Sequence, residues 1–388
     1  MTGLYLHIPF CKSRCIYCGF YSTVRHNLMR PYVDGMIREM SLRPLPANEA
    51  VGTIYLGGGT PSQLPSDLLA ELFYNIYKVY RVADKAEVTM ECNPDDVDDD
   101  FVAALADLPV NRISMGAQTF SDQRLRFLHR RHTARQVGEA VERLRRGGIG
   151  NISIDLMFGF PGETLAEWEN DIAAATSLGV EHISAYSLMY EEGTPLYDRK
   201  MKDPRLHIVD EETERQMYET LIDRLTAAGF EHYEISNFAR FGDTTEPGRQ
   251  TKANSWRSQH NSSYWNGTPY IGIGAAAHSY DIRTRSWNVA DIDLYISRLL
   301  SGNLPVEGSE IIDEATRYND IVTTALRTRD GIDLSNLPSS ATDFRSYLLS
   351  NAETHLRSGM LQITNGRIHL TRQGLFVSDD IMSDLIYV

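Results

Sequence analysis

The stretch HIPFCKSRCIYCGF, residues 7–20, places Cys11, Cys15 and Cys18 in a C-x3-C-x2-C pattern directly after an apolar, strand-like run. The whole chain of 388 residues has only 4 cysteines. Three thiolates can hold one iron–sulfur cluster, whereas clusters that only carry electrons are normally held by four cysteines. A zinc site would need a fourth ligand at zinc-finger spacing, which this stretch lacks. The pattern therefore indicates a four-iron cluster with one iron open to a small molecule.

Composition narrows the class of protein. The hydrophobic fraction of 42% and the length allow two or more domains with a sizeable core. No stretch reaches the apolar length of a membrane span, and the N-terminus has no signal-peptide pattern. The net charge of −14 argues against nucleic acid or anionic lipid as a partner. Few, clustered thiols are typical of the reducing cytoplasm, where we expect the protein to act.

Apolar, β-branched runs alternate with amphipathic stretches up to about residue 235. The expected strands are 4–10, 53–58, 87–92, 112–118, 152–159 and 182–189, with helices such as 30–42 and 133–148 between them. This alternation predicts an α/β fold, a partial (β/α)6 barrel whose parallel strands carry functional side chains at their C-terminal ends. The acidic run 95–100 could be a metal site, but we interpret it as the start of a helix.

The alternation of strand-like and helix-like runs stops after about residue 235. Residues 238–259 are polar and aperiodic, which predicts a loop or domain junction. Beyond residue 310 the pattern predicts helices at 314–327 and 341–359, a hairpin at 361–371 and a last helix at 372–386, an order that resembles a winged helix. Residues 310–388 have a net charge of −4, which argues against DNA binding. We therefore predict a barrel at 1–237, a junction with barrel-completing strands at 238–309 and a smaller α+β module at 310–388.

Glycine or polar residues lie in or at the ends of four of the predicted strands. The second ends in the run Gly57–Pro61, which lacks the G-x-G-x-x-G spacing of dinucleotide sites. The third ends at Glu91, whose carboxylate suits a pair of ribose hydroxyls, and the fourth ends at Gln118. The fifth carries Asp155 in an apolar run, where burial needs a partner. Arg130 could neutralise a ligand carboxylate or form an ion pair with Asp155, and both alternatives stay open.

The cysteine pattern, with Tyr17 before the last cysteine, resembles the signature of the radical S-adenosylmethionine (SAM) enzymes. This resemblance implies a 4Fe-4S cluster whose open iron binds the amino and carboxylate groups of SAM. Further segments, among them YLGGGTPS, ISMGAQTF, IDLMFGFPGET and YIGIGAAAHSY, are similar to the oxygen-independent coproporphyrinogen III oxidase branch of that family. The similarity runs in order from residue 4 to about residue 281 and includes the winged-helix-like tail.

The resemblance also implies which positions contact SAM. Those expected at the cluster-bound SAM are Tyr5, Gly58, Glu91 and His278. Those expected at this SAM or at a second SAM molecule are Tyr17, Gly59, Thr60, Gln118, Arg130, Asp155 and Met189. Met189 and His278 differ in residue type from the oxidase.

At Phe20 the sequence departs from the oxidase, which has a further cysteine at that position. With an aromatic residue there, the sequence resembles the HemW-type heme chaperone subgroup. The H-N-x-x-Y-W motif of that subgroup is present as His260, Asn261, Tyr264 and Trp265. This resemblance implies binding of heme and its delivery to apo-proteins. An imidazole can ligate heme iron while aromatic rings cover a porphyrin. Alternatively, the motif caps a turn and packs the domain junction, and His278 is a rival iron ligand.

Three functions are compatible with the sequence: a heme chaperone, the anaerobic oxidase that converts coproporphyrinogen III to protoporphyrinogen IX, and a radical SAM enzyme on an unrelated substrate. The residue at position 20 favours the chaperone over the oxidase. An anaerobic assay with reductant, SAM and coproporphyrinogen III separates the first two. Reductive cleavage of SAM without heme binding or porphyrin turnover would indicate the third.

Overall fold

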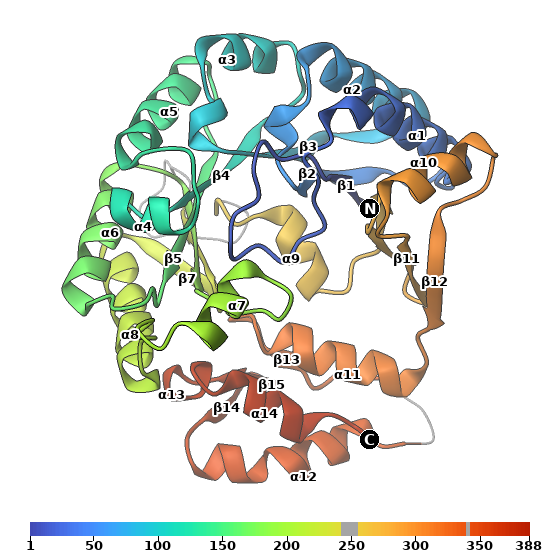
Figure 1. Cartoon of the computed structure of the whole chain (residues 1–388). Helices are drawn as coiled ribbons and strands as arrows, with labels where there is room; N and C mark the ends of the chain where they lie inside the picture. Colours follow the sequence, from blue (N-terminus) through green and yellow to red (C-terminus); the bar gives the residue numbers. More distant parts are fainter. Residues whose placement is uncertain (242–254, 339–341) are drawn as a thin grey trace.

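Six parallel strands form the centre of the molecule, a computed structural model in which residues 1–241, 255–338 and 342–388 are described (Figure 1). Each pairs in parallel with the next, in chain order. They are β1 (Thr2–Ile8), β2 (Val51–Gly58), β3 (Val82–Cys92), β4 (Arg112–Gln118), β5 (Ile152–Phe158) and β6 (His182–Ser187). The predicted strands are thus confirmed in number and order, with ends that differ by a few residues. The last predicted strand was drawn too long, because β6 ends at Ser187 and Met189 lies in the following loop.

Helices cover the outer face of this curved sheet, and the chain alternates strand and helix as the α/β prediction requires (Figure 1). Helix α5 shows why they form: a capping box at Thr133 opens it, and its apolar side chains recur at helical spacing on the buried face. The helices of this part are α1 (Met29–Leu42), α2 (Ser66–Val79), α3 (Asp99–Ala106), α4 (Asp122–Phe127), α5 (Ala134–Arg146), α6 (Leu165–Ser177), α7 (Pro195–Lys202) and α8 (Glu211–Ala227).

Additional strands extend both edges, giving one 12-stranded sheet within the described residues. Next to β1 lie β9 (Tyr270–Ile273), β10 (His278–Tyr280), β11 (Thr284–Asn288) and β12 (Val306–Ile311), and next to β6 lie β8 (Asn237–Arg240) and β7 (Phe230–Glu234). The predicted loop at 238–259 is therefore wrong at its start, because buried Phe238 and Ala239 belong to β8. Residues 242–254 of that prediction lie outside the described residues.

The short helix α9 (Gln259–Trp265), which carries the H-N-x-x-Y-W motif, lies inside the curve of the sheet (Figure 1). The hydroxyl of Ser258 accepts a hydrogen bond from the amide of Asn261 and so begins the helix. The cap is thus supplied by Ser258, not by His260 or Asn261 as one sequence interpretation had it. On the outside, α10 (Ile292–Leu300) packs against α1.

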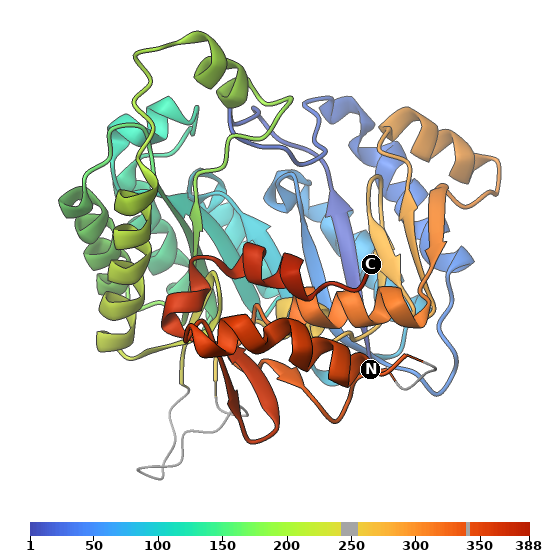
Figure 2. The same ribbon diagram turned by 90° about the horizontal axis from the view of Figure 1, so that it is seen from below.

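The C-terminal module has its own hydrophobic core, around Tyr318, Phe344 and Ile368. Its elements are α11 (Glu314–Ala325), β13 (Ile332–Asp333), α12 (Phe344–Arg357), β14 (Leu361–Thr364), β15 (Arg367–Leu370), α13 (Arg372–Leu375) and α14 (Ser378–Leu385). The winged-helix-like order follows the prediction, except that the last helix is broken into α13 and α14. Figure 2 shows this module across the open side of the sheet, away from the loop that follows β1.

The acidic run 95–100 is explained by local structure. The side chain of Asp98 accepts a hydrogen bond from the amide of Phe101 and caps α3, which confirms the helix interpretation. Asp96 is buried and forms ion pairs with Lys12 and Arg131 at 3.1 and 3.2 Å. The run therefore ties the loop after β1 to the barrel.

Candidate functional site

The three cysteines lie on a closed loop at the C-terminal end of β1. A bridge between Phe10 and Thr23 closes the base of the loop, with the Cys11 amide donating to the Thr23 carbonyl at 2.9 Å. Ile16 anchors its tip in a small apolar cluster with Leu128, Met157, Phe160, Leu188 and Leu196. The loop is therefore held by packing that does not involve the thiols.

All three thiols are free and partly exposed. Burial raises the pKa of Cys11 and of Cys18, and the neighbouring thiol of Cys15 raises both further, so the three sulfurs lie close enough to interact. Within the described parts of the chain, no three Cys, His, Asp or Glu side chains converge as the ligands of a single ion would. A cubane cluster gives each thiolate its own iron and therefore needs more widely spaced sulfurs. The donor set fits such a cluster, because bound metal replaces the thiol protons.

The glycine run after β2 packs closely against the start of the cysteine loop. The strand register places Gly58 beside Ile8, and the Gly59 amide donates to the Ile8 carbonyl at 2.8 Å. A Cβ on Gly58, whose φ is +105°, would lie 2.4 Å from the His7 ring, and one on Gly59 would lie 2.6 Å from the Pro9 backbone. Side chains are excluded here, which leaves the backbone free to approach a ligand.

Glu91 lies at the same edge, one strand further. Its carboxylate accepts hydrogen bonds from the Tyr55 hydroxyl at 2.7 Å and from the Gly58 amide at 3.1 Å. Burial raises the pKa of Glu91 to about 7, and the negative charge of Asp155 adds to the rise. The Tyr5 hydroxyl lies 3.0 Å from Nδ1 of His7 and its ring stacks near Tyr55. Tyr5, Gly58 and Glu91 therefore lie together at the barrel mouth.

Arg130 reaches the cysteine loop and does not pair directly with Asp155. Its guanidinium donates to the Asn93 side chain and to the Gly116 carbonyl, both at 2.6 Å, and to Sγ of Cys15 at 3.6 Å. The alternative of an Arg130–Asp155 ion pair is therefore wrong. Asn93, which no sequence motif singles out, follows β3 immediately and also donates to the Thr60 hydroxyl, which in turn donates to Sγ of Cys11 at 3.6 Å.

Two further predicted residues, Gln118 and Asp155, lie on β4 and β5. Gln118 has a φ of +65°, a conformation that non-glycine residues rarely adopt and that often marks functional sites. Its side chain lies near that of Arg130, since a Cβ on Gly116 would approach both. Burial raises the pKa of Asp155 to about 6, against the opposing effects of the Ser184 hydroxyl and the charge of Arg112.

Tyr17 packs against the apolar cluster under the cysteine loop, and burial raises its pKa. Three other side chains near the mouth are more exposed. Met189 and Phe20 are 62% and 69% exposed. His278 is exposed at the start of β10, with its ring stacked 6.1 Å from that of Trp287. These side chains can meet a ligand or partner that approaches from solvent.

His260 of the H-N-x-x-Y-W motif is a buried hydrogen-bonding residue. Its Nδ1 lies 2.8 Å from the Thr53 hydroxyl, its Nε2 lies 2.9 Å from the Tyr264 hydroxyl, and its ring stacks on Tyr55 at 5.1 Å. Burial lowers the pKa of His260 to about 3, so the imidazole is neutral. Both ring nitrogens are occupied, and neither is available to a heme iron in this arrangement.

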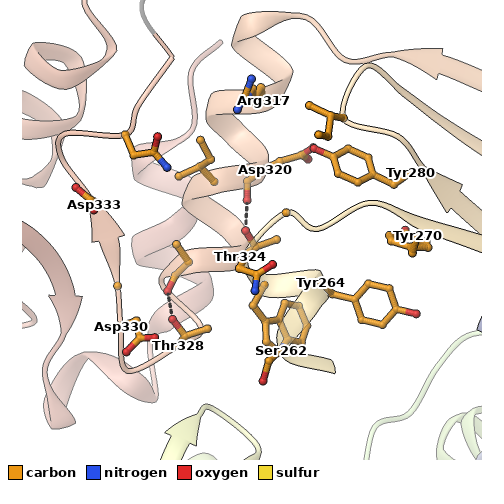
Figure 3. A pocket seen from close by; sticks show the side chains of 18 of the residues that line it. Ser262, Tyr264, Tyr270, Tyr280, Arg317, Asp320, Thr324, Thr328, Asp330 and Asp333 are labelled. Atoms are coloured by element: carbon orange, nitrogen blue, oxygen red, sulfur yellow. Dashed lines mark hydrogen bonds between the residues drawn. The ribbon is translucent and has the colours of Figure 1, made fainter. Parts of the chain in front are cut away.

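Tyr264 and Trp265 line a cavity of about 620 Å³ between the barrel and the C-terminal module. Figure 3 shows Tyr264, Tyr270 and Tyr280 on one side of it and Arg317, Asp320 and Thr324 of α11 on the other. The guanidinium of Arg327 lies 5.1 Å from the Trp265 ring, so this tryptophan also packs the junction. Sequence reasoning could not find this cavity, because its walls come from segments far apart in the chain.

The sequence matches two known family patterns: the radical SAM superfamily over residues 5–175 and the HemN C-terminal domain over residues 312–377. It is 33% identical to the protein named heme chaperone HemW of Bacillus subtilis, over 98% of both chains. It is 31% identical to the protein of the same name of Lactococcus lactis, over 99% of this chain and 97% of that one.

The fold has a solved counterpart. Coproporphyrinogen III oxidase (HemN) from Escherichia coli, described as a radical SAM enzyme, matches 99% of this chain and 90% of its own with a TM-score of 0.84. The sequence identity is 20%, so this likeness concerns the fold alone. It confirms the predicted partial barrel with its C-terminal extension. Among the described residues, no helix is long and apolar enough to cross a membrane.

Proposed function

This chain belongs to the radical SAM superfamily and, within it, to the family of the heme chaperone HemW, and we propose that it binds heme and delivers it to apo-proteins. The observation that carries the proposal is the 33% identity to a protein of that name over 98% of both chains. Phe20, where the oxidase branch has a further cysteine, supports the chaperone over the oxidase. We expect this chain to act in the reducing cytoplasm, where few, clustered thiols stay reduced.

Membership in the superfamily implies a 4Fe-4S cluster and SAM, and the residues at the mouth fit both groups. Cys11, Cys15 and Cys18 would hold the cluster, with Thr60 and Arg130 contacting two of the sulfurs at 3.6 Å. When bound, the cluster and SAM supply one-electron chemistry, and the protein supplies binding and orientation. These two groups would occupy the C-terminal ends of the strands.

The chain's own residues would orient SAM at this edge. The glycine run offers backbone without side chains, and the Glu91 carboxylate can accept hydrogen bonds from a pair of ribose hydroxyls. Arg130, held by Asn93 and Gly116, would stay in place beside the cluster when SAM binds or leaves. Gln118, Asp155, Tyr17 and Met189 would complete the surroundings of SAM. The cysteine loop would close one side of this site, and His278 would border another.

Heme binding and transfer are tested on protein reconstituted with iron and sulfide under anaerobic conditions. We expect stoichiometric heme uptake by absorbance titration and transfer of that heme to a heme-free acceptor protein. In a parallel assay with dithionite and SAM, coproporphyrinogen III should remain unchanged. Formation of protoporphyrinogen IX would assign the oxidase function instead, and SAM cleavage with neither heme uptake nor porphyrin turnover would indicate an unrelated substrate.

A further inference from the structure

We propose that the cavity between α9 and α11 is the tetrapyrrole site, and that it binds heme through oxygen donors and an arginine, away from the cysteine loop. This inference rests on the proposed heme function and deepens it by locating the ligand. The cavity volume of about 620 Å³ lies within the roughly 300–1,000 Å³ that is typical of ligand sites. Its two sides come from the barrel and from the C-terminal module (Figure 3).

The barrel side of the cavity is lined by four aromatic side chains. Tyr264, Trp265, Tyr270 and Tyr280 all line it, and the rings of Tyr264 and Tyr270 meet edge to face at 4.8 Å. Arg327 covers Trp265 at 5.1 Å, which fixes that ring in the wall. A planar macrocycle can gain apolar burial and edge or face contacts with such rings. Tyr264 and Trp265 of the motif would therefore act on heme as a wall, while His260 positions Tyr264 through its hydrogen bond.

The cavity lining contains four arginines and three aspartates, and one of the arginines is placed to take a carboxylate of a ligand. The other three arginines are already paired: Arg285 with Asp320 and Glu310 and Arg367 with Asp333, each at 2.7 Å, and Arg257 with Glu231. Arg317, on the first turn of α11, is exposed and has no ion pair among the described residues. Its guanidinium can accept a propionate without breaking an existing pair, and such charge-assisted hydrogen bonds are the stronger ones.

The donors in the cavity predict the type of iron ligation. Among the residues that the structure describes, the lining contains no histidine, cysteine or methionine, and the phenol of Tyr280 points toward α11 in Figure 3. Tyrosine is an established axial ligand of heme iron. Heme in this cavity would therefore have oxygen ligation. Heme at the barrel mouth would instead meet the exposed imidazole of His278 or the thioether of Met189.

The cavity and the cysteine loop lie at opposite ends of β1. Tyr270 in the cavity wall pairs with Gly3 at the start of that strand, whereas the loop follows Ile8 at its end. Five residues of strand separate them by about 17 Å. Two bulky cofactors can therefore be held at the same time, which a shared mouth site would prevent.

The first test is a heme titration of the reconstituted full-length protein and of Arg317→Glu. We expect this variant to weaken hemin binding about tenfold or more, because it replaces an attraction to propionate by a repulsion. The matched control is Arg345→Glu, the same charge change at an exposed site on α12 outside the cavity, and its affinity should equal that of the wild type. Hemin dimethyl ester, which lacks the free carboxylates, should bind wild type and Arg317→Glu alike.

The second test is the spectrum of the bound ferric heme. An oxygen-ligated, high-spin spectrum that changes in Tyr280→Phe and persists in His278→Ala is expected. A nitrogen-ligated spectrum that His278→Ala abolishes, or equal hemin affinity for Arg317→Glu and Arg345→Glu, would overturn the location in the cavity. Absence of heme binding by the wild type would instead refute the proposed function itself, so the two failures are distinguishable.

Discussion

Binding of SAM should depend on the protonation of Glu91. Burial and the charge of Asp155 raise the pKa of Glu91 to about 7, so in the free protein the side chain is about half protonated at neutral pH. A protonated carboxyl has lost acceptor capacity for ribose hydroxyls and its attraction to the sulfonium of SAM. The carboxylate is the binding form, and affinity should rise as the pH rises through 7.

The size of the pH effect on SAM affinity follows from the pKa of Glu91, which is about 7. If only the ionised form binds, affinity falls about tenfold from pH 8 to pH 6, which equals about 1.4 kcal/mol. Removing the negative charge of Asp155 takes away one cause of the raised pKa of Glu91. The variant Asp155→Asn should therefore move the midpoint to lower pH, and at pH 6.5 this shift by itself should raise the ionised fraction of Glu91.

The assay is calorimetric titration of the reconstituted protein with SAM between pH 6 and pH 8. The amino group of SAM also titrates in this range, with an ordinary α-amino pKa of roughly 7.7–8.0, and it must be separated from Glu91. The variant Glu91→Gln provides that separation, because the amide can still pair with Tyr55 while it does not titrate. We expect the affinity ratio of wild type to variant to grow about tenfold over the range. A constant ratio would refute the reasoning.

Three further variants test the local structure. Cys15→Ala should lose the cluster in an iron assay and keep a cooperative thermal transition, because packing around Ile16 holds the loop. Gly59→Ala should lower the free energy of unfolding by about 1–3 kcal/mol, seen as a lower melting temperature, because its Cβ would lie 2.6 Å from the Pro9 backbone. It should also weaken cluster retention. Gly150→Ala, with nothing within 4 Å, is the control that should change neither. Thr53→Val leaves Nδ1 of buried His260 without a partner and should cost about 1–3 kcal/mol in denaturant unfolding; an unchanged midpoint would contradict the assigned hydrogen bond.

The barrel mouth could be predicted from sequence because its residues follow one rule. In a parallel sheet the strand ends meet at one edge, so Gly58, Glu91 and Gln118 had to lie near the loop that follows β1. Tyr55 was missed because a tyrosine within an apolar strand is usually a core residue.

Partners far apart in the chain could not be predicted. His260 is separated by 207 positions from Thr53, whose hydroxyl holds its Nδ1. Nothing in H-N-x-x-Y-W indicates that the histidine is buried and the aromatic residues line a cavity. Arg130 was similarly ambiguous, because its choice of Asn93 over Asp155 depends on the path of the chain after β3. Such contacts arise from tertiary packing, which local pattern does not encode.

The same long-range contacts connect the mouth to the cavity. The Tyr55 hydroxyl donates to the Glu91 carboxylate at 2.7 Å, and the Tyr55 ring stacks on His260 at 5.1 Å. Nε2 of His260 lies 2.9 Å from the Tyr264 hydroxyl in the cavity wall. Because His260 uses both ring nitrogens in this chain, loss of either partner leaves a buried polar atom unsatisfied. A change at one site would therefore alter the packing of the other. If the two sites are coupled, Thr53→Val should change both SAM and heme affinity although Thr53 is assigned to neither ligand, whereas unchanged affinities in a folded variant would show that the two sites act independently.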